Sequence, residues 1–187
     1  MTDAARAGPC VEDFEPGMVL RHPIGRTVTA TDNTWFTLLT VNTNPIHFDA
    51  HYAAQTEFGR PLVDSTFTLA LVTGLSVGDV SRHAVNLGWR QVRLPAPVFE
   101  GDTIYATSEV LTVRESKSRP QMGIVEIRTT GFKHDGTVVI EFERSILIYK
   151  RDHVPKIPVP IAGSGKREAG DSGENDGAQG RPRVRNT

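Results

Sequence analysis

Asp64-Ser65-Thr66-Phe67-Thr68-Leu69-Ala70-Leu71-Val72-Thr73-Gly74-Leu75 is the stretch that decides the fold. Its apolar residues fall on every side of a helical wheel, and a helix that is hydrophobic all round is a buried helix. Asp64, Ser65 or Thr66 supplies the N-cap. The stretch therefore predicts a core helix whose amide groups and positive dipole end begin directly after a polar segment.

The segments that follow this helix are typical of β-strands. Apolar and polar residues alternate roughly within them, as in half-buried antiparallel strands. The four runs are Val85–Leu94, Thr103–Arg114, Gly123–Lys133 and Thr137–Lys150. Asp135-Gly136 is a strong hairpin signal between the last two. These elements predict an α+β fold in which a curved antiparallel sheet wraps round one buried helix.

Shorter elements precede the buried helix. Val19–Thr31 has β-branched residues around a proline and a glycine and predicts a broken first strand. Thr31 or Asp32 is expected to cap a helix that follows. Asp49 is expected to cap a second, short helix over His51–Gln55.

Composition limits the class of protein. The chain has 187 residues, a net charge of −1 and one cysteine. We therefore expect no nucleic-acid or membrane partner, no metal site and a cytoplasmic location. Composition also predicts three parts: an N-terminal lead at 1–13, one domain at 14–161, and a polar, disordered tail at 162–187.

The segment Asn42 to Asp49 carries the candidate chemistry, with His47 at its centre. It lies between two expected helices, and Pro45 disfavours helix at Asn44. Its polar groups are therefore expected on a loop. Loops set on a rigid scaffold commonly hold reactive groups.

These residues resemble the signature of the MaoC-like (R)-specific enoyl-CoA hydratases, which have the hot-dog fold. The matching pieces are Asn44–Asp49, Tyr52–Ala54 and Gly59–Val63, with further similarity at Phe14–Met18 and Pro97–Thr103. The resemblance covers about residues 14 to 150. It implies the hot-dog fold and syn addition of water to the C2=C3 bond of an enoyl-CoA, or the reverse dehydration. It implies no cofactor beyond the CoA of the substrate.

The resemblance also implies roles for individual residues. His47 matches the catalytic histidine, and the amide of Ser65 matches the donor to the thioester oxygen. The catalytic aspartate of the family falls on Asn42, which can orient water but cannot exchange its proton. Asp64 and Ser65 replace the usual His-Gly pair. The surrounding residues look like the mesaconyl-CoA hydratase branch, where the acyl group is branched and dicarboxylic.

Several roles remain open at this point. Asp64 is a helix cap or a substitute carboxylate for the site. Asn44 is a turn cap or a substrate contact. Arg60, Arg90 or Arg93 could bind a substrate carboxylate or a CoA phosphate, and Arg60 is the favoured one.

Two rival functions accompany the hydratase hypothesis. The chain could be a non-catalytic acyl-CoA-binding subunit of a hetero-oligomeric hydratase, which the two departures favour and His47 opposes. A thioesterase would need a carboxylate near the start of the buried helix, where Asp64 is the only candidate. By analogy with other hot-dog domains, we expect a homodimer.

Overall fold

The structure, a computed structural model of the chain, describes residues 8–157. The expected tail at 162–187 lies outside the described residues, as does most of the expected lead. The chain divides into two units, Met1–Val154 and Pro155–Thr187, and only Pro155–Ile157 of the second is described. The sheet and the helices all lie in the first unit.

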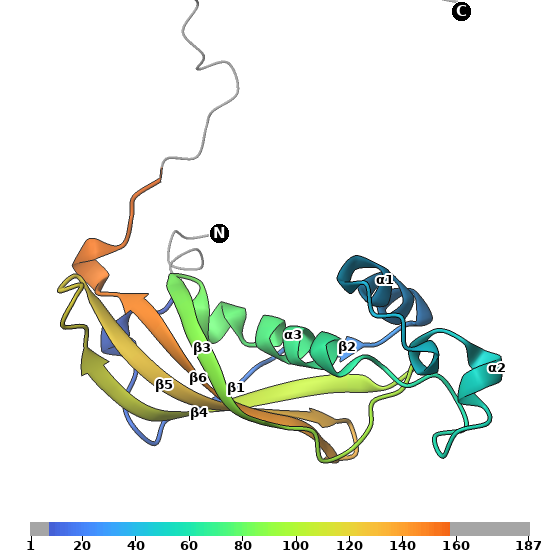
Figure 1. The fold of residues 1–187 in the computed structure, drawn as a ribbon. Coiled ribbons are helices and arrows are strands. Elements are labelled where there is room, and N and C mark those ends of the chain that lie inside the picture. Colours follow the sequence, from blue (N-terminus) through green and yellow to red (C-terminus); the bar gives the residue numbers. More distant parts are fainter. Residues whose placement is uncertain (1–7, 158–187) are drawn as a thin grey trace, which may run out of the picture. The chain divides into compact units, whose positions relative to one another are not determined.

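An antiparallel sheet forms the body of the domain (Figure 1). Its strands are β1 (Val19–Arg21), β2 (Arg26–Thr27), β3 (Ala84–Arg93), β4 (Thr103–Glu115), β5 (Met122–Lys133) and β6 (Val138–Tyr149). The order across the sheet is β1-β4-β5-β6-β3, and β2 also pairs with β4. The four expected long strands and the broken first strand are therefore confirmed.

The helices are α1 (Ala30–Thr40), α2 (Ala50–Ala53) and α3 (Ser65–Leu75), with short helical turns η2 (Val11–Asp13), η3 (Pro45–His47), η4 (Val77–Ser81) and η5 (Arg151–His153). Asp49 caps α2 as expected, through its bond from the Tyr52 amide. The expected cap of α1 is wrong by two residues or more. Thr29 is the cap, and Asp32 completes a capping box with it because its carboxylate accepts the Thr29 amide.

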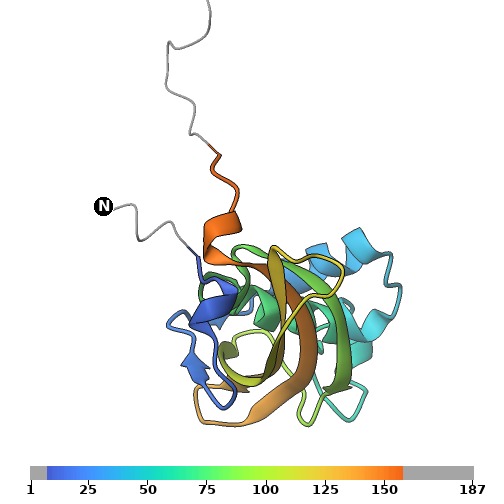
Figure 2. The same ribbon diagram turned by 90° about the vertical axis from the view of Figure 1, so that its left-hand side faces the viewer.

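Helix α3 lies on the concave face of the sheet, which curves round it (Figures 1 and 2). Val72 is fully buried there in a cluster with Ile140 and Phe142. A second cluster beyond the C-terminal end of α3 includes Val11 from the expected lead, so the packed structure begins before residue 14. The alternation of buried and half-buried residues along β4, β5 and β6 has its cause in this arrangement.

We expected α3 to be buried on every side. In the isolated chain only one side of the helix is buried. Thr68 and Val72 face the sheet and are 2% and 0% exposed. Ala70 and Gly74, on the opposite side, are exposed. The helix is therefore more hydrophobic than one covering sheet requires.

Buried polar groups cross the concave face. The ring of His22 lies 2.9 Å from both the Asp79 carboxylate and the Ser108 hydroxyl. Arg144 is 1% exposed, and it donates to the Ser76 hydroxyl at 2.6 Å. Burial lowers the pKa of Arg144 to about 10. These groups tie the end of α3 and the turn after it to the sheet.

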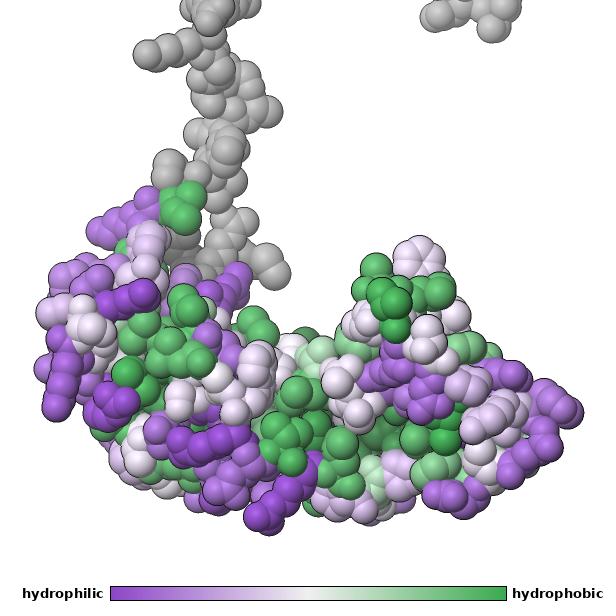
Figure 3. All heavy atoms as spheres, viewed as in Figure 1, coloured by the Kyte–Doolittle hydropathy of each residue, from purple (hydrophilic) through white to green (hydrophobic). Residues whose placement is uncertain are grey.

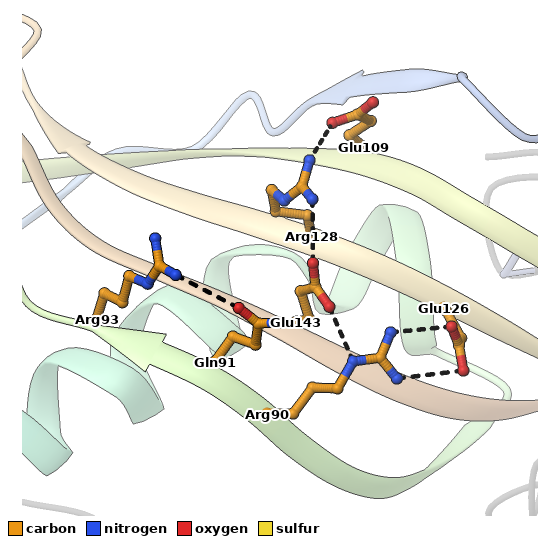
Figure 4. A network of polar contacts seen from close by, with 7 residues as sticks. All are labelled: Arg90, Gln91, Arg93, Glu109, Glu126, Arg128 and Glu143. Carbon is orange, nitrogen blue, oxygen red and sulfur yellow. Dashed lines mark hydrogen bonds and ion pairs between the residues drawn. The ribbon is translucent and has the colours of Figure 1, made fainter.

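Ion pairs join the strands on the convex face (Figure 4). Arg90 of β3 pairs with Glu126 and Glu143, and Arg128 of β5 pairs with Glu143 and Glu109. These carboxylates raise the pKa of Arg90. The hypothesis that Arg90 binds a substrate anion is therefore not supported, because two carboxylates already hold its guanidinium.

Candidate active site

Helix α1, the loop after it and the start of α3 form the candidate site. Val41 ends α1 in the left-handed conformation, with φ of 56°, which is unusual for a β-branched residue. The turn brings the Asn42 amide onto the Thr37 carbonyl at 2.9 Å. It thereby sets where the side chain of Asn42 begins.

His47 lies at the end of η3 and is 8% exposed. Its Nδ1 lies 2.8 Å from the carbonyl oxygen of Leu62. A carbonyl oxygen can only accept, so Nδ1 donates and carries the proton. In the neutral ring Nε2 is then the basic nitrogen. The fold therefore fixes the tautomer that a general base requires.

Asp64 is the N-cap of α3 and is 3% exposed. Its carboxylate accepts from the Thr66 amide at 2.7 Å, the Phe67 amide at 3.2 Å and the Thr66 hydroxyl at 2.5 Å. Burial alone would raise its pKa, but the hydrogen bonds from Thr66, Asn42 and Phe67 outweigh burial and hold the pKa below its usual range. Of the two roles open for Asp64, the helix cap is confirmed.

Asn42 and Asp64, the two departures from the family signature, touch each other. The Asn42 amide nitrogen donates to Oδ2 of Asp64 at 2.5 Å. Its oxygen accepts from the Asn44 amide at 3.1 Å. Because both ends of the Asn42 amide are engaged, its orientation is fixed, and one N–H remains for a further acceptor such as water.

Ser65 occupies the first position of α3 and is exposed. The Asp64 carboxylate accepts the next two amides, whereas the first amides of a helix have no intrahelical partner. Ser65 lines a cleft of about 250 Å³ whose other walls are mainly apolar. The lining residues are Phe58, Leu62, Val63, Ser65, Thr68, Leu94, Pro95, Ala96, Pro97 and Val98. The helix start therefore faces a space in which an acyl thioester could lie.

Asn44 and Arg60 lie at the edges of this arrangement. The Asn44 side chain caps η3 by accepting the Ile46 amide at 3.3 Å, which is the turn-cap alternative. The Arg60 guanidinium lies over the Phe99 ring, 4.1 Å from its centroid. Within residues 8–157, no hydrogen bond joins Arg60 to His47, Asn42 or Asp64. Its role as a substrate contact stays a prediction.

Sequence reasoning missed Asn33, which is 0% exposed on the inner side of α1. Its amide nitrogen donates to the carbonyls of His47 and Leu62, and its oxygen accepts the Asp64 amide. The sequence feature that could have indicated its burial is its spacing of four residues from Thr37, which is also buried. That pattern puts a polar side of α1 inward.

Other kinds of site find little support in the part of the chain that the structure describes. Among those residues, no group of three His, Cys, Asp or Glu side chains is placed to hold a metal ion. No helix among residues 8–157 has the length and hydrophobicity to cross a membrane.

Replacing Asp64 with asparagine is expected to lower the free energy of unfolding by about 1 kcal/mol at pH 7, because asparagine caps but carries no charge at the helix N-terminus. The pKa of Asp64 is depressed in the fold, so its contribution is present above the unfolded value near 4 and is lost as pH falls through the folded value. The difference between the two proteins should therefore shrink from pH 7 to pH 3 in urea titrations. A difference that does not change with pH would contradict the charged-cap assignment.

Comparison with known proteins identifies the family of the chain. The family model described as mesaconyl-CoA hydratase matches residues 1–186. The chain is 32% identical over 163 residues to the mesaconyl-CoA hydratase of Cereibacter sphaeroides, covering 84% of this chain and 47% of that protein. The chain spans about half the length of the first curated relatives it matches.

Solved structures similar to this chain include MaoC-like and hot-dog proteins. A MaoC domain protein dehydratase from Chloroflexus aurantiacus superposes with a TM-score of 0.73 at 31% identity, over 82% of this chain and 45% of that one. A Mycobacterium tuberculosis protein with a double hot-dog fold superposes with a TM-score of 0.71 at 22% identity, over 88% of this chain and 53% of that one, which supports the fold alone. The expected hot-dog fold is therefore confirmed, and the chain belongs to the mesaconyl-CoA hydratase family of MaoC-like proteins.

Proposed function

We propose that the chain hydrates the C2=C3 bond of a short enoyl-CoA, or dehydrates the corresponding 3-hydroxyacyl-CoA, with a branched dicarboxylic acyl group favoured. The single observation that carries the proposal is the bond from His47 Nδ1 to the Leu62 carbonyl. It leaves Nε2 as a base on the segment that leads into the cap of α3. The similarity to mesaconyl-CoA hydratases supports the substrate class.

The chemistry follows from which groups can exchange a proton. Asn42 cannot, and hydrogen bonds hold the pKa of Asp64 low, so Asp64 stays a carboxylate. His47 is then the proton-exchanging group of the three. Its Nε2 takes a proton from water as the oxygen adds to C3, and the same nitrogen returns that proton to C2. Both additions occur from one face, which makes the reaction a syn addition.

The start of α3 serves the other end of the substrate. As water adds to C3, negative charge develops on the thioester oxygen. The Ser65 amide and the positive end of the helix dipole stabilise that charge. Asn42 holds the water with its remaining N–H. Arg60 has no carboxylate partner within residues 8–157, so its guanidinium is free to receive an anionic group of the substrate.

A spectrophotometric screen of the purified protein against crotonyl-CoA, mesaconyl-CoA and longer enoyl-CoAs tests this function. We expect loss of the enoyl absorbance, fastest with mesaconyl-CoA. No turnover of any of these thioesters, in either direction, would contradict the proposal.

A second function is favoured by one observation. The Asp64 carboxylate is engaged by four hydrogen bonds and cannot replace the missing acid. The chain would then be an acyl-CoA-binding subunit that completes the site of a partner. Binding of CoA thioesters without turnover would identify this case. The same engagement of Asp64 argues against the thioesterase hypothesis, which needs that carboxylate for hydrolysis.

We also propose that the chain forms a homodimer in which a second hot-dog domain covers α3 and extends the sheet. Strand β3 lies at the edge of the sheet and exposes large apolar side chains (Figure 3). They are Val85, Leu87, Trp89 and Val92, each 44% to 52% exposed. The open side of α3 needs a cover, and relatives about twice as long support the presence of a second domain.

Replacing Leu87 with aspartate is expected to shift the protein to a single chain of 20.5 kDa, whereas we expect the wild type to sediment at twice that mass. A charge on the strand edge opposes pairing with another strand. Ile24→Asp is the matched control, since Ile24 is 67% exposed and lies outside β3. Sedimentation equilibrium decides, and a Leu87→Asp protein that keeps the wild-type mass rules out pairing through β3.

A further inference from the structure

We propose that Asn33 is a positioning residue that holds His47 and the start of α3 in one fixed relation. The proposal rests on the proposed hydratase function for its kinetic test, but its structural test does not need turnover. The three groups that Asn33 bonds lie 14, 29 and 31 residues away along the chain. One side chain therefore joins the base, its anchor and the helix cap.

The hydrogen bonds of Asn33 use both N–H donors of its buried side-chain amide and one lone pair of the amide oxygen. Nδ2 donates to the His47 carbonyl at 2.7 Å and to the Leu62 carbonyl at 3.1 Å. Oδ1 accepts the Asp64 amide at 3.0 Å. The residue is 0% exposed, so water cannot replace these bonds without rearrangement.

The Leu62 carbonyl is the link to catalysis. It accepts from Asn33 and also from Nδ1 of His47, at 2.8 Å. Asn33 therefore fixes the acceptor that fixes the imidazole tautomer, and it holds the backbone of His47 as well. Through the Asp64 amide it sets the position from which the amide groups of α3 point at the thioester.

The chemistry of this position specifies an amide side chain. The position must donate to two carbonyls and accept from one N–H, all without solvent. An ionised aspartate would place its negative charge against two carbonyl oxygens, and a hydroxyl has only one proton to donate. An apolar side chain would leave the buried His47 carbonyl and Asp64 amide without the partner that Asn33 gives them, and the Leu62 carbonyl with its bond from His47 Nδ1 alone.

Two variants separate positioning from a purely structural role. Asn33→Ala removes all three bonds, and Asn33→Asp keeps the acceptor for the Asp64 amide but loses the two donors. Thr129→Val is the matched control, because Thr129 is also 0% exposed and its side-chain hydroxyl bonds to Ser108, on the sheet. All proteins are assayed below their melting temperatures, with the folded state verified by circular dichroism.

We expect both Asn33 variants to lower kcat on mesaconyl-CoA by about 10²-fold, the usual effect of a misplacement near 1 Å. KM should change by less than about threefold, since Asn33 does not line the cleft beside Ser65 in which we place the acyl thioester. Thr129→Val should keep kcat within about twofold of wild type. Equal kcat values for Asn33→Ala and Thr129→Val would overturn the proposal.

The second measurement needs no turnover. In ¹⁵N spectra recorded at a pH where the ring is neutral, His47 of the wild type should carry its proton on Nδ1, and the control should match it. In Asn33→Ala the ring should populate both tautomers. If the wild type turns over no enoyl-CoA but this tautomer change is seen, the proposed function fails and the positioning role stands. A fixed Nδ1–H tautomer in Asn33→Ala would refute the positioning role, whatever the activity.

Discussion

Replacing His47 with alanine is expected to lower turnover of the enoyl-CoA by about 10²- to 10⁴-fold, the usual contribution of a general acid–base group. His47 is the group of the site that can exchange a proton, since Asn42 is an amide and the carboxylate of Asp64 is engaged by four hydrogen bonds. Steady-state assays with mesaconyl-CoA measure the loss of turnover. A His47→Ala protein that keeps most of its activity would remove His47 from the mechanism.

The stability of this variant distinguishes catalysis from packing. The Leu62 carbonyl keeps its bond from Asn33 when the ring is removed, so the free energy of unfolding should fall by no more than about 1–2 kcal/mol. His47→Asn is the matched control. Its side-chain nitrogen is attached to Cγ, as Nδ1 is, and it can donate to Leu62 without providing a base. We expect His47→Asn to regain stability but to remain as inactive as His47→Ala.

Replacing Asn42 with aspartate is expected to destabilise the protein and to lower its activity on mesaconyl-CoA. The Asn42 amide lies 2.5 Å from the Asp64 carboxylate, so the change puts two carboxylates in contact. At an effective dielectric constant near 20, two like charges about 3 Å apart repel by roughly 5 kcal/mol. Protonation of one carboxyl relieves this repulsion.

The stability of the Asn42→Asp variant is expected to fall as pH rises. One carboxyl of the new pair has its pKa raised by the other, so the folded variant binds more protons than the unfolded chain at neutral pH. The loss of stability should therefore be largest above the raised pKa and should shrink as pH falls toward the unfolded value near 4. Urea titrations between pH 5 and pH 8 measure it. Equal stability of variant and wild type at pH 8 would show that residues 42 and 64 do not touch.

The activity of the Asn42→Asp variant distinguishes a site that has lost its catalytic acid from a site adapted to asparagine. If the chain is a linear-enoyl hydratase that has lost its acid, Asn42→Asp should raise activity on crotonyl-CoA. If the site is adapted to asparagine, the added charge lies beside an anionic substrate and activity on mesaconyl-CoA should fall, which is the result we expect. The double variant Asn42→Asp, Asp64→Asn is the control. It exchanges carboxylate and amide and should regain much of the lost stability, because asparagine also caps helices well.

The sequence by itself determined the elements of the fold. Alternation with a period of two located β4, β5 and β6 to within two residues at their ends. The Asp135-Gly136 hairpin was also found from local sequence, and Gly136 has the positive φ, 88°, that the turn requires. These features depend on neighbours within a few residues, so a single chain without structural information reveals them. The signature round His47 then pointed to the family.

Only the tertiary structure decided how the site is assembled. Asn42 and Asp64 are 22 residues apart, and no periodicity relates a loop residue to the cap of a later helix. Asn33 was missed because an asparagine inside a helix has no local pattern that marks it as buried. Its burial results from α1 packing its polar side onto the loop and onto α3. Burial of α3 on only one side is likewise a property of the whole chain, since hydrophobicity shows that a helix needs cover but not whether its own chain or another provides it.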